Sequence, residues 1–256
     1  MTGGLLVITA HPDDEVLIAG GTLAACAELG LPTSVVCLTR GENGPIADRR
    51  LASRRTLAAV RTQELRVACA ELGVEFVKCY RRQDGSLRWA NRAELASQLA
   101  GVIDKRRPEA VISFGPDGLY YHPDHIATYE LARMGVRRAG YKAALYRSVW
   151  VTAELGELAA ELRRRGLPHG LWGLDLDELG VDEDERGEEV VVDVRRFVAQ
   201  KLSALYCHRT QLEPGNALLT LPDDLAERLL GRERFARVDR RSSPLLTRLA
   251  REVAHA

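Results

Sequence analysis

The sequence has no excess of either charge. Its 36 lysine and arginine residues balance 36 aspartate and glutamate residues, so the formal net charge is +0 and the pI is about 7.0. Binding to nucleic acid or to an anionic membrane depends on a strongly basic surface, which this composition does not provide. We therefore predict neither a nucleic-acid partner nor a membrane partner.

Long apolar runs and paired cysteine motifs are also missing. The longest uncharged stretch near the N-terminus, residues 16–27, is too short to cross a bilayer core of about 30 Å, and no basic segment precedes the first apolar run as in a signal peptide. The five cysteines are odd in number and widely spaced, without a Cys-x-x-Cys pair. We expect them to be reduced and buried, in a cytoplasmic protein.

What the sequence does contain is a regular alternation of strand-like and helix-like segments. With 256 residues, 46% of them hydrophobic, the chain can form one large domain. Strands separated by helices form parallel sheets with right-handed crossovers, so the pattern predicts an α/β, Rossmann-like fold with a mostly parallel sheet flanked by helices. We expect strands at 4–9, 33–38, 74–79 and 110–114, and helices at 14–29, 56–72, 92–105 and 123–136.

The pattern is looser after residue 141. We treat residues 1–256 as a single domain, in which 1–141 form the core and 142–256 add substrate-side elements and a small C-terminal appendage that starts near Glu213. The acidic stretch 174–189 is typical of a surface insertion. Further elements are expected as strands at 144–151 and 190–194 and as helices at 153–165, 195–207 and 223–230.

Two similar polar motifs follow two of the buried strands. His11-Pro12-Asp13-Asp14 comes after the first strand, and His122-Pro123-Asp124-His125 comes shortly after the fourth; each motif opens a helix. The carboxyl ends of parallel strands share one edge of the sheet, where open α/β folds bind their ligands. We therefore expect the two motifs to meet.

The residue types in these motifs are those of a catalytic metal site. His11 and Asp14 are three residues apart across a helix start, and His125 supplies a third ligand from the other turn. Two histidines and one carboxylate favour Zn²⁺ with an open position for water, although Fe²⁺ binds the same ligand types. Both metals stay open at this point.

The neighbouring side chains provide acid and base groups. Asp13 is adjacent to a ligand and can take a proton from the attacking water. His122 can act as a general acid or can hydrogen-bond the oxyanion, and Asp124 can hold His122 in the required tautomer. Together these groups predict hydrolysis of an amide.

Simpler interpretations exist for each motif. Asp13 or Asp14 can act only as a helix cap, and a Rossmann-like fold can bind a nucleotide without hydrolysis. Dinucleotide binding, however, needs a Gly-x-Gly-x-x-Gly loop, whereas Gly20 and Gly21 fall inside the predicted helix. A purely structural or interaction protein gives no reason for ligand-type residues at two strand ends.

These motifs resemble a known family, the LmbE-like (PIG-L) zinc-dependent de-N-acetylases. The resemblance is carried by residues 10–15, 19–24 and 122–125, extends over about 5–126, and includes a weaker match at 201–211. It implies a set of roles for individual residues. The implied ligands are His11, Asp14 and His125; Asp13 is the base, His122 the acid or oxyanion stabiliser, Tyr120 a stabiliser of the intermediate, Arg61 a contact for substrate hydroxyls or phosphate, and Asp84 a sugar-binding residue.

Some of these positions have other interpretations. Taken alone, Arg61 and Glu64 fit an exposed pair on a helix, and Asp84 fits a turn. Tyr121 stands where many family members have glycine. For His208, in the weaker match, a core or surface position and a pocket position are equally open.

The sequence thus predicts a zinc-dependent hydrolase that removes an N-acetyl or other short N-acyl group from an amino sugar. The substrate can be a glycoconjugate, a thiol-cofactor precursor or a natural-product glycoside in a bacterial cytoplasm. An amidase that cleaves an N-acyl thiol conjugate is the alternative with the same chemistry. A homo-oligomer is compatible with the sequence.

Overall fold

A computed structural model describes residues 3–171, 174–180, 188–214, 216–239, 241 and 243–253. Its first half alternates strands and helices close to the predicted positions. The elements are β1 (Leu5–Thr9), α1 (Asp14–Glu28), β2 (Thr33–Thr39), α2 (Leu57–Glu71), β3 (Phe76–Arg82), η1 (Leu87–Trp89), α3 (Arg92–Arg106), β4 (Ala110–Ser113), α4 (Gly118–Tyr121) and α5 (Pro123–Arg138).

The second half adds strands, helices and several short 3-10 turns. The strands and helices are β5 (Ala144–Val149), α6 (Thr152–Arg164), β6 (Gly170–Leu171), β7 (Leu174–Asp175), β8 (Glu189–Asp193), α7 (Val198–Tyr206), α8 (Asp223–Leu230), β9 (Arg232–Arg237) and α9 (Pro244–Glu252). The 3-10 turns are η2 (Leu176–Glu178), η4 (Arg195–Phe197), η5 (Arg209–Gln211) and η6 (Ala217–Leu219). Of the predicted acidic insertion 174–189, residues 181–187 lie outside the described residues.

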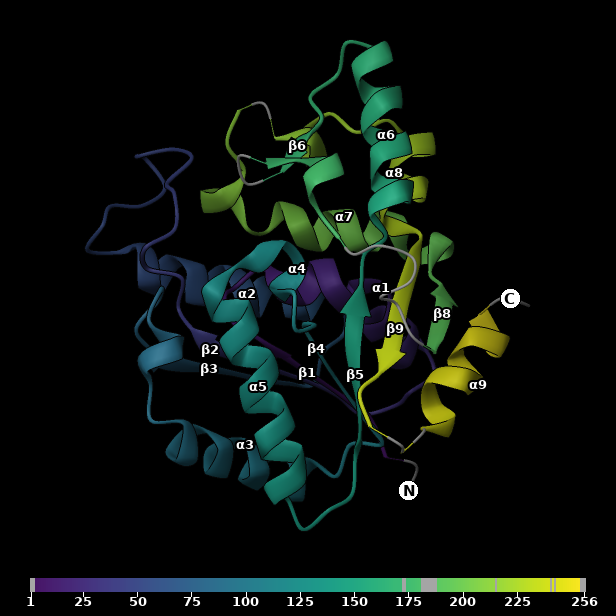
Figure 1. Ribbon diagram of the computed structural model, residues 1–256. Helices are drawn as coiled ribbons and strands as arrows, with labels where there is room; N and C mark the ends of the chain where they lie inside the picture. Colours follow the sequence, from purple (N-terminus) through teal and green to yellow (C-terminus); the bar gives the residue numbers. More distant parts are fainter. Residues whose placement is uncertain are drawn as a thin grey trace.

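The central sheet has the strand order β3-β2-β1-β4-β5-β9-β8. The first five strands are parallel, and β9 is antiparallel to both β5 and β8. Figure 1 shows α3 beside α5, and shows β5 and β9 pointing in opposite directions. The predicted α/β fold with a mostly parallel sheet is confirmed.

The C-terminal region is built into the sheet more closely than predicted. Strand β9 was not expected because Arg232–Arg237 contains three arginines and a glutamate, which hide its strand pattern. Phe235 of this strand is nevertheless fully buried, and the strand pairs with β5 on one side and β8 on the other. Helix α9 was also missed.

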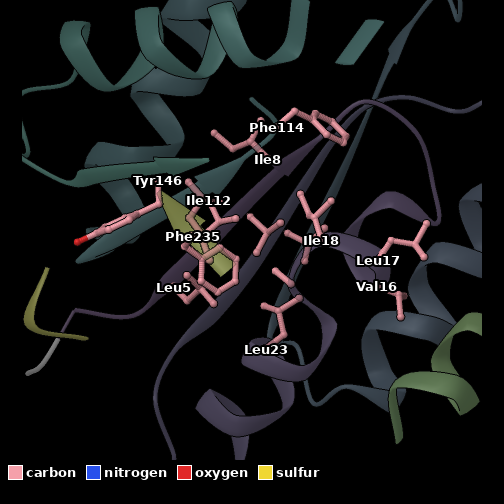
Figure 2. Close-up of a cluster of buried hydrophobic side chains, with 14 of the residues drawn as sticks. Leu5, Ile8, Val16, Leu17, Ile18, Leu23, Ile112, Phe114, Tyr146 and Phe235 are labelled. Carbon is pink, nitrogen blue, oxygen red and sulfur yellow. The ribbon is translucent and has the colours of Figure 1, made fainter. Parts of the chain in front are cut away.

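The core lies around β1 and α1. All five residues of β1 are buried, which explains why its sequence is a continuous apolar run. Figure 2 shows Leu5 and Ile8 of β1 with Ile112 of β4, Ile18 of α1 and Phe235 of β9. Burying each such side chain contributes roughly 1.5–3 kcal/mol, so this contact fixes α1 against the sheet.

The two glycines of α1 allow other side chains to pack closely against this helix. Gly20 and Gly21 lie inside this helix, next to a kink at Ala19 where φ is −154°. A Cβ atom at Gly21 would lie 2.5 Å from the Cβ of Val194, so only glycine allows this approach. These glycines therefore do not form a phosphate loop, and the predicted nucleotide-binding alternative finds no support here.

The sequence predicts neither a membrane-spanning helix nor a disulfide bond. Within the described ranges, no helix has the length and apolarity needed to cross a membrane. All five cysteines are free thiols, and three of them are buried. The expected burial thus holds for Cys26, Cys37 and Cys69, whereas Cys79 and Cys207 are partly exposed.

Candidate metal centre and active site

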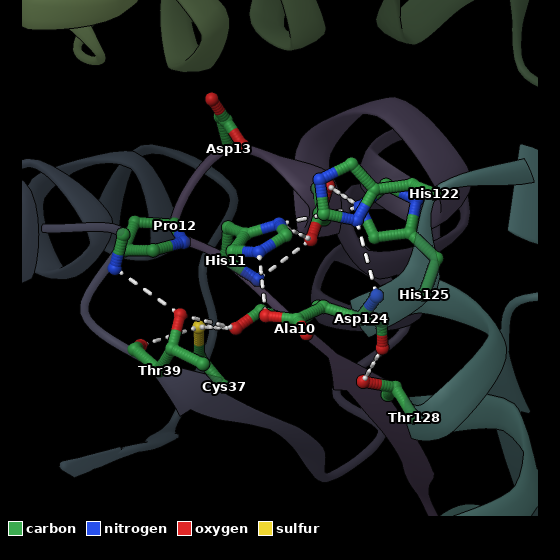
Figure 3. Close-up of polar contacts among 12 residues, drawn as sticks. Ala10, His11, Pro12, Asp13, Cys37, Thr39, His122, Asp124, His125 and Thr128 are labelled. Carbon is green, nitrogen blue, oxygen red and sulfur yellow. Dashed lines mark hydrogen bonds and ion pairs between the residues drawn. The ribbon is translucent and has the colours of Figure 1, made fainter. Parts of the chain in front are cut away.

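The two His-Pro-Asp turns meet at the carboxyl edge of the sheet. Strands β1 and β4 are neighbours in parallel register, with Leu5 opposite Ala110, so the turns that follow them start side by side. His125 Nε2 lies 3.2 Å from His11 Nδ1. Figure 3 shows the rings of His11, His122 and His125 gathered between the two turns.

Asp14 completes a group of three ligand-type side chains, with one carboxylate oxygen near each histidine. Its Oδ2 lies 3.5 Å from His11 Nδ1, and its Oδ1 lies 3.3 Å from His125 Nε2. In a tetrahedral site with ligand bonds of about 2.1 Å, ligand atoms lie about 3.4 Å apart. The spacing of His11, Asp14 and His125 therefore fits one divalent metal ion.

The contacts on the far side of the two histidine rings show which nitrogen of each ring faces the other ring. His125 Nδ1 lies 3.1 Å from the carbonyl oxygen of Gly118, which only accepts, so this nitrogen carries the proton. His11 Nε2 lies 3.1 Å from Oδ1 of Asp84, at ion-pair distance but without the geometry of a hydrogen bond. The two nitrogens that face each other, 3.2 Å apart, would bind a metal ion once the proton between them is released, and the partners on the far side position the rings as in known metal sites.

The local charge also favours a cation. Burial opposes protonation of His11, but Asp124, Asp14 and Asp84 outweigh it and raise the pKa of this imidazole well above its usual value. A divalent ion would neutralise the same excess of negative charge. The side chain of His125 is fixed further by stacking on Phe114, with ring centroids 3.9 Å apart.

The carboxylate of Asp124 is engaged away from His122. Its carboxylate accepts from the backbone N–H groups of Gly85 (2.7 Å) and Leu87 (3.0 Å), and its Oδ2 lies 3.5 Å from His11 Nε2. The first turn of α5 directs the carboxylate toward the 84–87 loop, so Asp124 contacts His122 through its backbone N–H and not through its side chain. Asp124 supports His11 instead.

Asp84 lies on the same side of His11. Besides its contact with His11 Nε2, it accepts from the backbone N–H of Asn43 at 2.9 Å. Burial raises the pKa of its carboxyl, but the contacts with His11 outweigh this and lower it to about 2. Asp84 also lines the cavity, so the predicted sugar contact stays a prediction beside the observed contact with His11.

His122 caps helix α5 and is held in one tautomer. The backbone N–H of Asp124 donates to its Nδ1 at 3.2 Å, so Nε2 carries the proton of the neutral ring. Burial, followed by the charges of His125 and His11, lowers the pKa of His122 to about 4. His122 also has a ring nitrogen within 4.8 Å of the donor atoms of His11 and His125.

Asp13 occupies the N-cap position of α1 but makes no capping hydrogen bond with its side chain. The alternative interpretation of Asp13 as a simple cap is therefore wrong. Its Oδ2 lies 3.0 Å from Nη2 of Arg61, and its backbone has φ 110°. Burial raises the pKa of its carboxyl to about 6, against the opposing charge of Arg61.

Arg61 and Glu64 are both buried, so the interpretation as an exposed pair on a helix is wrong. The guanidinium of Arg61 donates to the carbonyl oxygens of Gly41 (2.8 Å) and Pro12 (2.6 Å) as well as to Asp13. Arg61 thus connects three parts of the site. It also lines the cavity, and its predicted substrate contact stays a prediction.

These residues open onto one cavity of about 690 Å³, within the usual range for small-molecule sites. Tyr120 lies on its wall, and burial raises the pKa of its phenol, which keeps the hydroxyl protonated. The other groups lining the cavity include Asn43, Gly44, Pro45, Gly85, Gly170, Gln211 and Glu213.

Two buried ion pairs near the site were missed from the sequence. Glu15 pairs with His208, with Oε1 2.8 Å from Nε2, and Lys201 pairs with Glu233 at 2.7 Å. Glu15 directly follows the first motif, and Lys201 and His208 lie in the weaker match at 201–211. The location of Glu15, Lys201 and His208 in or beside these motifs was the available signal for a role near the site. Each residue's partner, however, lies far away in the sequence. His208 is therefore a core residue rather than a surface residue.

Comparison with known proteins identifies the family. The family model for GlcNAc-PI de-N-acetylase (PIG-L) matches residues 6–135. The chain belongs to this family.

Individual relatives agree with this assignment. A 1D-myo-inositol 2-acetamido-2-deoxy-alpha-D-glucopyranoside deacetylase of Mycobacteroides abscessus is 32% identical, covering 82% of this chain and 82% of the relative. The protein of the same name from Mycobacterium sp. (strain JLS) is 29% identical, and the match covers 94% of this chain and 85% of the relative. The structure of N,N'-diacetylchitobiose deacetylase from Pyrococcus horikoshii is similar with a TM-score of 0.60 and 25% identity, covering 88% of this chain and 73% of that chain.

The comparisons confirm the predicted family, the predicted fold and the predicted class of enzyme, a deacetylase that hydrolyses an amide. The names of the relatives agree with amino-sugar de-N-acetylation. A His/Asp cluster that could hold a metal ion is present. The roles of individual site residues stay predictions.

Proposed function

We propose that this protein removes the acetyl group from the nitrogen of an amino sugar in a small glycoconjugate, with Zn²⁺ as its metal ion. The observation that carries the proposal is the convergence of His11 Nδ1, the Asp14 carboxylate and His125 Nε2, with distances of 3.2, 3.3 and 3.5 Å. Two histidines and one carboxylate leave a fourth position open, as in catalytic zinc sites.

A metal ion held by these residues supplies Lewis acidity, which polarises the amide carbonyl and activates water. The chain supplies the proton transfers. Asp13, bound by Arg61 on the cavity wall, takes the proton of the attacking water and returns it to the nitrogen that leaves as an amine. The products are acetate and the free amino sugar.

His122 and Tyr120 stabilise the carbonyl oxygen as it becomes negative. Because His122 Nδ1 accepts from the N–H of Asp124, its Nε2–H is the group available to donate. This arrangement favours oxyanion stabilisation over the general-acid role for His122. The Tyr120 hydroxyl is a second donor on the same wall.

The proposed substrate class is supported by the names of the relatives. They are named as deacetylases of an N-acetylglucosamine linked to inositol and of diacetylchitobiose, and both substrates join an N-acetyl amino sugar to a second ring. A cavity of about 690 Å³ accommodates a molecule of this kind. We propose the same class for this chain.

The test measures the metal content of the purified protein and the acetate that it releases from a panel of N-acetylglucosaminides. Acetate release is compared without additions, with a chelator, with added Zn²⁺ and with added Fe²⁺. We expect about one metal per chain and release that a chelator abolishes; an N-acyl thiol conjugate in the panel tests the amidase alternative. The His125→Ala variant should lose metal, whereas His122→Ala should keep metal and lose turnover. A wild-type protein that binds no added metal would overturn the proposal.

A further inference from the structure

The main chain of Asp13 has a conformation that L residues rarely adopt. Its φ is 110° and its ψ is −31°, outside the regions that a side chain with a Cβ atom normally allows. Such a conformation persists only where the surroundings hold it, and it is typical of functional sites. The contacts around Asp13 show what holds it.

Two groups bind Asp13 from different directions. Its backbone N–H donates to Oε2 of Glu15 at 3.0 Å, and its carboxylate accepts from Arg61 at 3.0 Å. The first contact fixes the peptide group and the second fixes the side chain. The orientation of the carboxylate therefore depends on where Glu15 is held.

Glu15 is held by His208. Its side chain is fully buried, and its second oxygen, Oε1, lies 2.8 Å from Nε2 of His208, which is also buried. Burial opposes protonation of His208, but the charge of Glu15 outweighs it and raises the pKa of this imidazole, so Nε2 of His208 carries a proton and donates to Glu15. A continuous chain of hydrogen bonds thus runs from His208 through Glu15 to Asp13.

His208 lies in a turn that is itself fixed. Its N–H donates to the carbonyl of Leu205 at 3.0 Å, and its own carbonyl accepts from Gln211 at 2.9 Å. Two residues further on, Thr210 donates to Glu64 through its N–H (2.9 Å) and its hydroxyl (2.6 Å). Because Glu64 lies on α2 together with Arg61, one turn supports both groups that bind Asp13.

We propose that His208 is a positioning residue for hydrolysis, which acts through Glu15 to fix the main chain of Asp13 and keep its carboxylate on the cavity wall. The inference rests on the proposed function for one point, the use of Asp13 as the base. Among the described residues, those that line the cavity do not include His208, so its effect on the reaction is indirect.

The test is a matched pair of substitutions at this position. His208→Gln places an amide N–H where Nε2 lies now, whereas the shorter side chain in His208→Asn does not reach Glu15. We expect His208→Asn to lower kcat roughly 10- to 100-fold, because small displacements of a reacting group have effects of this size. KM and metal content should change little, and His208→Gln should restore most of kcat.

A control variant separates this effect from general destabilisation. Tyr206, at the end of α7 and two residues before His208, donates to the carbonyl of Leu218 at 3.1 Å; Tyr206→Phe removes this bond without touching Asp13 and should leave kcat unchanged. Equal kcat in His208→Asn and His208→Gln, normalised to folded and metal-loaded protein, would overturn the inference. Loss of metal in His208→Asn would also overturn it, since the turn would then support the metal ligands instead.

A crystal structure of His208→Asn gives a readout independent of activity. The inference expects Asp13 to leave its φ of 110° and its contact with Glu15 to break. Unchanged geometry of Asp13 would refute it even if turnover falls. A wild-type protein that binds metal but releases no acetate would count against the proposed function, while this structural readout still decides the inference.

Discussion

Lys201 and Glu233 form an ion pair inside the protein, with Nζ 2.7 Å from Oε1 and both side chains almost fully buried. Glu233 also accepts from the N–H groups of Gly21 and Thr22, each at 2.8 Å. These two N–H groups follow the kink at Ala19, where the helical hydrogen bonds of α1 are interrupted. The pair therefore connects β9 to the helix that carries Asp14.

The Lys201→Met variant should be strongly destabilised. It leaves the Glu233 carboxylate buried without its counter-charge, and breaking a buried pair in this way costs about 3–5 kcal/mol. Adding Glu233→Gln should recover part of this loss, which urea denaturation of the single and double variants measures. The exposed Arg163, paired with Asp177 at 3.0 Å, provides the control. Arg163→Met should lower the free energy of unfolding by less than about 1 kcal/mol.

The Asp13→Asn variant should keep its metal and lose most of its turnover. Asparagine retains the oxygen that accepts from Arg61 but cannot take a proton, so kcat should fall by roughly 10²- to 10⁴-fold. Metal analysis and acetate release on the same sample check both parts. Asp104→Asn, in a residue that accepts from the N–H of Tyr141, should behave like the wild type. Unchanged turnover in Asp13→Asn would remove it as the base.

The Asp84→Ala variant should weaken metal binding rather than substrate binding. Asp84 lies 3.1 Å from Nε2 of His11, and loss of such a partner lowers metal affinity by roughly 10- to 100-fold. Competition with a chelator of known affinity measures this change. If KM rises while metal affinity stays the same, the role implied by the family, sugar binding, is the correct one.

The Tyr121→Gly variant should make the protein more stable. Tyr121 has φ 59° and is 76% exposed, so it is strained and makes little contact. The left-handed conformation costs an L residue about 1–2 kcal/mol, and the extra freedom of glycine in the unfolded chain costs about 0.5–1 kcal/mol. We expect a net gain of about 0.5–1 kcal/mol from these two terms. Tyr121→Ala keeps the Cβ atom and should show no gain.

The backbone at Tyr121 also explains a departure noted in the sequence. The resemblance to the family implies glycine at this position, and a positive φ is the conformation that glycine adopts without strain. The φ of 59° at Tyr121 is thus a physical reason to expect glycine there. The position lies next to Tyr120 and His122, which both line the cavity.

The sequence by itself determined the parallel core and the meeting of the two motifs. Local signals were sufficient there: β1 is a continuous apolar run, and Gly30 and Gly73 end the first two helices with φ of 65° and 71°. Once the strands are parallel, the carboxyl ends of β1 and β4 lie at one edge. The contact between His11 and His125 follows from this topology.

Only the tertiary structure decided how the charged side chains are paired. Glu15 with His208, Lys201 with Glu233, and Asp124 with His11 join residues that are far apart in the chain. A local pattern shows that a residue is charged but not which partner compensates its burial, because that partner is selected by packing. For the same reason β9 was hidden: its arginines and Glu233 mask a strand that the neighbouring strands β5 and β8 stabilise.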